Sequence, residues 1–331
     1  MTIYDIAKEV GVSASTVSRV INHKPGIKEE TRQKVKAALE KHNYYPDEIA
    51  RGLVNQSTRF IGILVSDIRI SHHAEGAYII QRHLLSLGYS SIIFNTGSDE
   101  ESQADCIRRV ASQHVVAVVM IGSVFQTDAI SRLIKCYLKN MPVVISNGYL
   151  NLPNVYGVLA DEQDGVESCV QLLYDKGRRH MAFLNDSDTV SNQRKQAGFE
   201  AGVRRLCPGA EPLVLQAEYR EDTLEFGRRA TRELMAAHPE VDGIIYGTDL
   251  CAAGGLQVLA ELGIPVPERA AVIGVNDSVY AQLCQPQLTS LNNRLKDLSI
   301  ACADILAKVV QKRESARKYL IFSEIVERQT T

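Results

Sequence analysis

The stretch that decides the fold of the N-terminal part reads Ile3-Tyr4-Asp5-Ile6-Ala7-Lys8-Glu9-Val10-Gly11-Val12-Ser13-Ala14-Ser15-Thr16-Val17-Ser18-Arg19-Val20-Ile21-Asn22. Its apolar residues recur at three- and four-residue intervals, which predicts two short helices over residues 3–10 and 14–22. Gly11 permits the tight turn between them, and the Ser13 hydroxyl can cap the second helix. A third predicted helix, residues 29–42, closes a small three-helix unit.

The second predicted helix leaves a small polar face exposed, made of Ala14, Ser15, Ser18, Arg19 and Asn22. Two short helices joined by a glycine turn are typical of a helix-turn-helix DNA reader. Packing in any small helical bundle explains the apolar pattern equally well, so this reading needs further support. Charge gives a little, because the first 60 residues hold ten Lys and Arg against seven Asp and Glu, whereas the whole chain has a net charge of −2. A basic head on an acidic body favours a polyanion as its partner.

The next segment, residues 46–58, predicts a hinge. It starts with a proline and a capping Asp47, and then has the length of about two helical turns, weakened by Gly52. An isolated helix needs roughly 12–15 residues to hold in water. We therefore expect this segment to be helical only against a partner.

These segments together resemble the head of lactose-repressor-type (LacI family) regulators. The resemblance rests on Thr2-Ile3-Tyr4-Asp5-Ile6-Ala7, Gly11-Val12-Ser13-Ala14-Ser15-Thr16-Val17-Ser18-Arg19-Val20-Ile21-Asn22, Glu30-Thr31-Arg32 and Pro46 with Ala50-Arg51-Gly52-Leu53. Two residues depart from the family pattern. Lys28 stands where a capping Ser is usual, which predicts a frayed start to the third helix, and Gly52 stands where Ser or Ala is usual, which makes the hinge harder to fold.

The resemblance implies roles for the matched residues. Ala14, Ser15 and Arg19 would meet base edges in the major groove, and the Arg19 fork suits guanine. Tyr4, Thr16 and Asn22 would hold phosphates or flanking bases, and Leu53 would wedge into the minor groove at the centre of a palindromic site beside its twin from a second subunit. The full candidate DNA-binding set is Tyr4, Ser13, Ala14, Ser15, Thr16, Arg19, Asn22, Arg51 and Leu53.

The body alternates short apolar runs with amphipathic helices. The predicted strands are residues 60–65, 91–94, 117–121, 143–145, 181–184, 243–246 and 271–275, and helices are expected over 74–87 and 165–176. Continuous apolar strands between helices are typical of parallel sheets covered on both faces. The predicted fold is an all-α helix-turn-helix head (1–45), a hinge helix and linker (46–58) and an α/β body (59–331). The resemblance implies that this body is periplasmic-binding-protein-like, with two doubly wound parallel-sheet lobes, and that residues 322–331 form its closing strand.

Ligands of open α/β sheets bind beyond the carboxyl ends of the strands. Those ends, read together with the family pattern, give the candidate effector-binding residues His72, His73, Arg194, Lys195, Tyr219, Asp249 and Asn276. Asn276 stands where the family mostly has an Asp that accepts two ligand hydroxyls. The cluster of His72, His73, Arg194 and Lys195 favours a phosphorylated or acidic ligand. A sugar or nucleoside held by neutral hydrogen bonds is nevertheless the main expectation, and the phosphorylated or acidic ligand is the alternative.

Enzyme signatures are missing from the sequence: it contains no GxGxxG after a strand, no GxxxxGK[ST], no GxSxG and no HExxH. The adjacent histidines have no third ligand nearby, so we expect neither a metal nor another cofactor. No stretch approaches the ~18 apolar residues of a membrane span, and no secretory signal is apparent, which predicts a cytoplasmic protein. The predicted function is a homodimeric repressor of a carbohydrate-related operon that binds palindromic double-stranded DNA and a small sugar, phosphosugar or nucleoside. Control by a coregulator protein, or a two-lobed binding protein or enzyme, are the alternatives.

Overall fold

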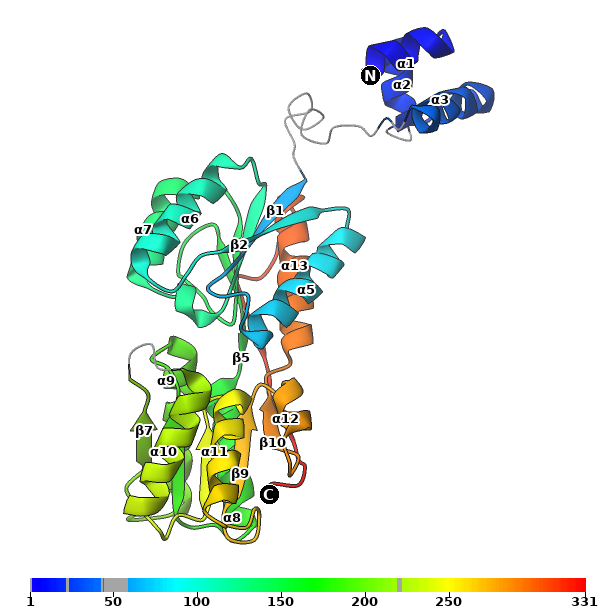
Figure 1. The fold of residues 1–331 in the computed structure, drawn as a ribbon. Helices are drawn as coiled ribbons and strands as arrows, with labels where there is room; N and C mark the ends of the chain where they lie inside the picture. The colour runs from blue at the N-terminus through cyan, green and yellow to red at the C-terminus, as the bar shows by residue number, and fades with distance from the viewer. Residues whose placement is uncertain (1, 22–23, 43, 45–58, 219–221) are drawn as a thin grey trace. The chain divides into compact units, whose positions relative to one another are not determined.

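The computed structural model describes residues 2–21, 24–42, 44, 59–218 and 222–331. The chain divides into two compact units, Met1–Arg59 and Phe60–Thr331, called here the head and the body (Figure 1). The predicted hinge at 46–58 and four candidate site residues (Asn22, Arg51, Leu53 and Tyr219) lie outside the described residues.

The head contains the three expected helices, α1 (Ile3–Val10), α2 (Ala14–Ile21) and α3 (Glu29–Lys41). Their apolar faces meet in one small core of Ile6, Ala7, Val17, Val20, Val35 and Ala38. The three predicted helices and their inward-facing apolar residues are confirmed, with Ile3, Val10, Ile21 and Leu39 partly buried at the edge of this core.

Local signals set the ends of these helices. Thr2 and Asp5 form a reciprocal capping box at the start of α1, and Gly11 ends it in the left-handed region with φ 73°. The Ser13 hydroxyl accepts a hydrogen bond from the Thr16 backbone N–H at 3.1 Å, as predicted for the cap of α2. Lys28 precedes α3 and gives it no side-chain cap.

The first lobe of the body is built on a six-stranded parallel sheet in the order β11-β5-β4-β3-β1-β2. Helices α5 and α13 pack on one face of this sheet, and α6 and α7 pack on the other. The elements of this lobe are β1 (Phe60–Val65), α5 (Ser71–Ser86), β2 (Ser90–Asn95), α6 (Glu100–Ser112), β3 (Ala117–Ile121), α7 (Asp128–Tyr137), β4 (Val143–Ser146), β5 (Val155–Ala160), α13 (Leu295–Val310) and β11 (Lys318–Ile321).

The second lobe repeats this plan with the order β12-β10-β9-β8-β6-β7, in which only β12 runs antiparallel to its neighbour. Helices α10 and α11 pack on one face, and α8 and α9 on the other. The elements are α8 (Glu162–Asp175), β6 (Met181–Asn185), α9 (Val190–Leu206), β7 (Leu213–Gln216), α10 (Thr223–Ala237), β8 (Gly243–Tyr246), α11 (Asp249–Glu261), β9 (Ala271–Val275), α12 (Val279–Leu283), β10 (Thr289–Asn292) and β12 (Glu324–Val326).

The chain passes between the two lobes after β5, after β10 and after β11 (Figure 1). The expected two-lobed α/β architecture is confirmed, but several boundaries differ from the prediction. Helices α5 and α8 each begin three residues earlier than expected, so His72 and His73 lie in the first turn of a helix and not in a loop. Four strands (β5, β7, β10 and β11) were not predicted as such, because their apolar runs are short or interrupted by glycine or polar residues. The expected closing strand within residues 322–331 is present as β12.

Candidate functional site

The outward face of α2 is small, polar and accessible. Ser15 and Arg19 are exposed, whereas Val17 and Val20 on the opposite face are buried. The Ser13 hydroxyl lies 2.8 Å from the Ser15 hydroxyl and 2.9 Å from that of Thr16, so the start of the helix carries a linked group of hydroxyls. Such a face can approach the edges of bases and the phosphates beside them.

Tyr4 and Arg19 are the two large candidate side chains of the head, and both are accessible. Tyr4 on α1 is 73% exposed, although it is one of the larger apolar side chains of the head. The Arg19 guanidinium donates from Nη2 to the Pro25 carbonyl oxygen at 2.7 Å. A guanidinium has five N–H donors in a fixed plane, so this bond uses one of five.

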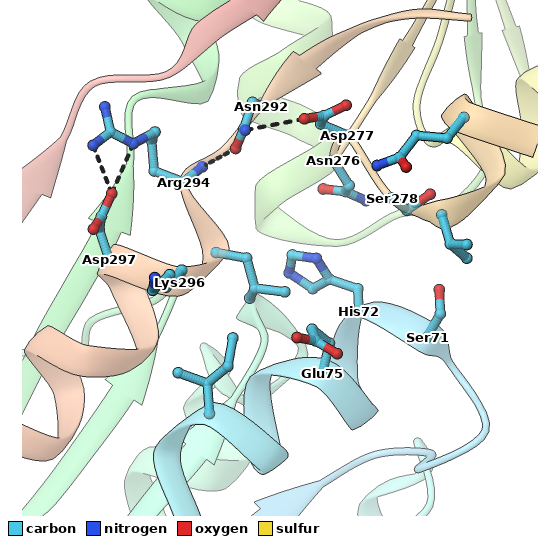
Figure 2. A pocket seen from close by; sticks show the side chains of 14 residues that line it. Ser71, His72, Glu75, Asn276, Asp277, Ser278, Asn292, Arg294, Lys296 and Asp297 are labelled. Atoms are coloured by element: carbon cyan, nitrogen blue, oxygen red, sulfur yellow. Dashed lines mark hydrogen bonds and ion pairs between the residues drawn. The ribbon is translucent and has the colours of Figure 1, made fainter. Parts of the chain in front are cut away.

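In the body, a pocket of about 540 Å³ opens between the two lobes (Figure 2). One wall is the start of α5 and of α13, from the first lobe, and the other is the end of β10 and the loop after β9, from the second lobe. The lining residues are Ser71, His72, Glu75, Ile79, Asn276, Asp277, Ser278, Val279, Gln282, Asn292, Arg294, Leu295, Lys296 and Asp297. Of the predicted effector-binding residues, His72 and Asn276 line this pocket.

The wall after β9 is held in an uncommon backbone conformation. Asn276 and Asp277 have φ values of 104° and 48°, a region that residues other than glycine rarely adopt. Asp277 is fixed by Arg328, whose Nη2 lies 2.6 Å from Oδ1, and by Asn292, whose Nδ2 donates to Oδ2 at 3.1 Å. The Asn276 side chain is therefore presented to the pocket from a braced loop.

The two histidines occupy different positions at the start of α5. His72 projects toward the loop that carries Asn276 (Figure 2), and burial, helped by His73 and Lys195, lowers its pKa to about 3. His73 Nδ1 lies 3.2 Å from the Asp67 carbonyl oxygen, and burial lowers its pKa as well. Both imidazoles are therefore neutral at neutral pH.

Lys195 and Arg194 lie on α9, in the second lobe. Lys195 is buried, and its Nζ donates to the Asn192 Oδ1 and the Gly247 carbonyl, each at 2.9 Å. Arg194 Nη2 donates to Gln126 Oε1 of the first lobe at 3.2 Å, while its Nη1 is buried without a hydrogen-bond partner among the described residues. Lys195 is thus part of the internal framework, whereas the Nη1 group of Arg194 is not engaged by any described residue.

Asp249 begins α11 beneath the pocket loop and is 1% exposed. Its Oδ2 accepts from the Ser278 backbone N–H at 2.6 Å and from the Ser278 hydroxyl at 2.8 Å, and its Oδ1 accepts from the Ser290 hydroxyl at 2.5 Å. Burial raises the pKa of Asp249 to about 6. The structure places this carboxylate behind the loop that lines the pocket.

A buried polar cluster joins the lobes beside the pocket, and the sequence reasoning did not find it. Glu162 Oε1 accepts from Ser191 Oγ at 2.5 Å, from Asn147 Nδ2 at 3.0 Å and from Asn293 Nδ2 at 3.3 Å. Asn293 Nδ2 also lies 3.2 Å from Asn276 Oδ1, which links the cluster to the pocket wall. A signal for Glu162 was present in the sequence. Glu162 lies two residues beyond the carboxyl end of β5, where ligand-binding residues of α/β sheets are expected, but β5 was not predicted as a strand.

Within the described ranges, no helix is long and apolar enough to cross a membrane. Nor does this part of the chain bring three or more His, Cys, Asp or Glu side chains together as a group that could bind a metal ion.

Comparison with known proteins agrees with both units. Residues 2–47 match the family model "Bacterial regulatory proteins, lacI family", and residues 170–331 match that of a periplasmic binding protein-like domain. An HTH-type transcriptional regulator of Lachnoclostridium phytofermentans is 30% identical, over 100% of this chain and 99% of its own length. The ribose operon repressor of Halalkalibacterium halodurans is 26% identical over 100% and 97%, and catabolite control protein A of Priestia megaterium is 26% identical over 94% and 93%.

Solved structures share the fold. The lac repressor dimer bound to operator and an anti-inducer superposes with a TM-score of 0.90 at 22% identity, covering 100% of this chain and 98% of that one. A cellobiose complex of the regulator CelR gives 0.73 at 24% identity, with full coverage of both chains. The resemblance seen in the sequence is thereby confirmed. The chain belongs to the lacI family of bacterial regulatory proteins, and it is a DNA-binding transcriptional regulator and not an enzyme.

Proposed function

We propose that this regulator is a cytoplasmic, homodimeric repressor that binds a palindromic operator and is controlled by a neutral, hydroxyl-rich effector such as a sugar or nucleoside. The observation that carries the proposal is the pocket whose walls come from both lobes. A ligand in such a pocket contacts the two lobes at once, so it binds one lobe arrangement better than another. Such differential affinity is what allows a ligand to shift a conformational equilibrium.

The charges around the pocket support a neutral effector over a phosphorylated one. Of the four basic residues that favoured an anion, both histidines are neutral and the Lys195 ammonium is engaged inside the second lobe. Arg194 alone keeps an unengaged donor, and the cross-lobe cluster beside it is centred on the Glu162 carboxylate. The pocket lining itself holds two cations, Arg294 and Lys296, against three carboxylates, Glu75, Asp277 and Asp297, and Arg294 is paired with Asp297 at 2.7 Å. A dianionic phosphate would therefore meet no excess of positive charge there.

Exposed apolar side chains support the dimer. Tyr78 and Leu85 on α5 are each 58% exposed, and Leu283 on α12 is 74% exposed. In the second lobe Leu283 borders a groove of about 390 Å³ that Leu256 and Tyr280 also line. Apolar surface of this kind marks interaction sites in many proteins, and a two-fold dimer places two heads on a palindromic operator.

The first test is a fluorescence-anisotropy titration of the full chain against a palindromic duplex of ~18 base pairs with a central CpG step, and against a scrambled duplex at equal salt. We expect tighter binding to the palindrome and a steep loss of affinity as salt rises. Selection from a random duplex library follows if the two duplexes bind equally. A library that yields no enriched motif would contradict the repressor proposal.

The operator complex then serves to test the effector. Neutral sugars, nucleosides and their phosphates are added separately, and we expect a neutral compound to change the operator affinity. A change produced only by phosphates would contradict the proposed effector class. If no small molecule acts while operator binding is intact, control by a partner protein becomes the better interpretation.

A further inference from the structure

The side chain of Arg19 is exposed, yet it is not free to explore the solvent. Its Nη2 donates to the Pro25 carbonyl oxygen at 2.7 Å, across a bend in the chain that follows α2. A long side chain loses up to about 2 kcal/mol of rotamer entropy when it is fixed. A backbone acceptor that fixes Arg19 before DNA arrives removes part of that loss from the binding step.

The segment that supplies this acceptor, Lys24–Gly26, is itself braced. Arg32 of α3 donates from Nη2 to the Lys24 carbonyl oxygen at 3.2 Å. The Lys24 backbone N–H donates to the Arg19 carbonyl oxygen at 2.9 Å. The position of the Pro25 carbonyl is therefore determined by α2 on one side and by α3 on the other.

Gly26 completes the arrangement. Its φ is 88°, and a β-carbon at this position would lie 3.3 Å from Arg19 Nη2. Any other residue there would strain the backbone and press on the guanidinium. Gly11, the other described glycine of the head, also has a positive φ of 73°, but a β-carbon there would meet nothing within 4 Å.

We infer that the Lys24–Gly26 segment positions the Arg19 guanidinium for base recognition, and that Gly26 is a specificity-determining residue which acts through Arg19. The inference rests on the proposed contact of Arg19 with a base. The Pro25 bond engages one edge of the guanidinium, and the other N–H donors remain for a bidentate contact with guanine O6 and N7.

The test compares four variants of the full chain, Arg19→Ala, Gly26→Ala, Arg32→Ala and Gly11→Ala, by selecting each against a random operator library and sequencing the bound duplexes. Arg19→Ala should reduce the preference at one base pair per half-site by about tenfold or more. Gly26→Ala should reduce the preference at that same base pair by about 3- to 10-fold. Arg32→Ala should produce the same change to a smaller extent.

Gly11→Ala is the matched control, since it places the same β-carbon on a left-handed backbone of the same unit. It should lower affinity for all duplexes alike and leave the selected motif unchanged. A purely structural role for Gly26 predicts this uniform loss for Gly26→Ala too. Circular dichroism melting of each variant shows whether the head is folded, and Arg32→Ala tests the segment even if Gly26→Ala unfolds.

Two results would overturn the inference while leaving the base contact intact. The first is an unchanged motif for both Gly26→Ala and Arg32→Ala when Arg19→Ala relaxes the motif. The second is a sharper base preference in Gly26→Ala, which would mean that the Pro25 carbonyl competes with the base for Arg19. If Arg19→Ala leaves the motif unchanged, the proposed base contact is wrong and the inference is wrong with it. The anisotropy titration reports DNA binding by the head independently of all three outcomes.

Discussion

At the scale of single residues, the body shows why a buried acid can govern a binding site it does not touch. Asp249 accepts hydrogen bonds from Ser278 and Ser290, and the loop above it carries two consecutive left-handed residues, Asn276 and Asp277. Each such residue costs about 1–3 kcal/mol and persists only where its surroundings hold it in place. Asp249 contributes to fixing them.

This position predicts a pH-dependent stability. Burial raises the pKa of Asp249 from 3.8 to about 6, so between these pH values the folded protein holds a proton that the unfolded chain has released. The site therefore favours folding below about pH 4 and loses that contribution as the pH rises through 6. Urea unfolding of the wild type and of Asp249→Asn at pH 5 and pH 7 tests this, because the stability of the wild type relative to the variant should be higher at pH 5. An identical difference at both pH values would contradict the assignment.

A second residue-scale prediction concerns the brace on Asp277. Replacing Arg328 by Gln should lower the free energy of unfolding by about 2 kcal/mol, because it leaves a partly buried carboxylate without its charged partner. Amide hydrogen exchange at Asp277 and Ser278 should also accelerate. Arg313→Gln is the control, since Arg313 is exposed and should change neither quantity. Equal exchange in both variants would show that Arg328 does not hold the loop.

At the scale of elements, the helices of the head differ in how their N-termini are capped. α1 has a complete capping box, whereas α3 starts after Lys28 without a side-chain cap. A Ser, Thr, Asp or Asn at the N-cap stabilises a helix by about 1 kcal/mol relative to a residue whose side chain cannot accept a hydrogen bond.

Lys28→Ser should accordingly raise the free energy of unfolding of the head by about 1 kcal/mol. Thr2→Ala, which removes the cap of α1, should lower it by a similar amount. Thermal melts of the head followed by circular dichroism measure both changes. A loss of stability in Lys28→Ser would mean that the lysine makes a contact more valuable than a cap.

The hinge segment carries its own prediction, although it lies outside the described residues. If Leu53 wedges into the centre of the operator, Leu53→Ala should weaken specific binding by more than it weakens binding to a scrambled duplex, since only the kinked site uses the wedge. Anisotropy titrations against both duplexes at one salt concentration give the two affinities. Equal losses would rule out the wedge.

The sequence predicts elements better than it predicts side-chain partners. Ile6, Val17 and Val20 follow helical spacing, and that spacing alone identifies them as core residues. Side-chain partners such as those of Lys195 could not be predicted. One of its acceptors, the Gly247 carbonyl, is 52 positions away in the chain, and no local sequence pattern indicates that contact. Glu162 was missed for a related reason, since its significance depends on a strand whose run of Val155-Tyr156-Gly157-Val158 is interrupted by a glycine.

At the scale of the whole molecule, the two lobes of the body are coupled through direct hydrogen bonds. Ser191 N–H donates to Ser123 Oγ at 3.0 Å, Arg194 reaches Gln126, and Glu162 gathers donors from both lobes. Any ligand that changes these contacts changes the relation between the lobes. By linkage, an effector that alters operator affinity has its own affinity altered by the operator to the same degree.

Glu162→Ala should therefore destabilise the body by about 3 kcal/mol or more, because it removes a buried acceptor from three donors. Glu261→Ala provides the comparison, since the Glu261 side chain is 45% exposed and pairs with Arg232 at the surface. That pair should contribute about 0–1 kcal/mol. Urea unfolding of the two variants measures both losses of stability. Equal destabilisation would mean that the buried hydrogen bonds of Glu162 contribute no more to the stability of the body than a surface ion pair does.

The three passages of the chain between the lobes have a further consequence for biosynthesis. The first lobe needs α13 and β11, which are synthesised after nearly all of the second lobe, and the second lobe needs the segment around Thr330, whose hydroxyl donates to the Val272 carbonyl in its interior. Neither lobe can be completed while the nascent chain is still emerging from the ribosome. The head, by contrast, has its whole core within its first 44 residues. Translation that stops midway would thus yield a folded DNA-binding head attached to an incomplete body. Such a product could contact operator DNA but could not respond to an effector.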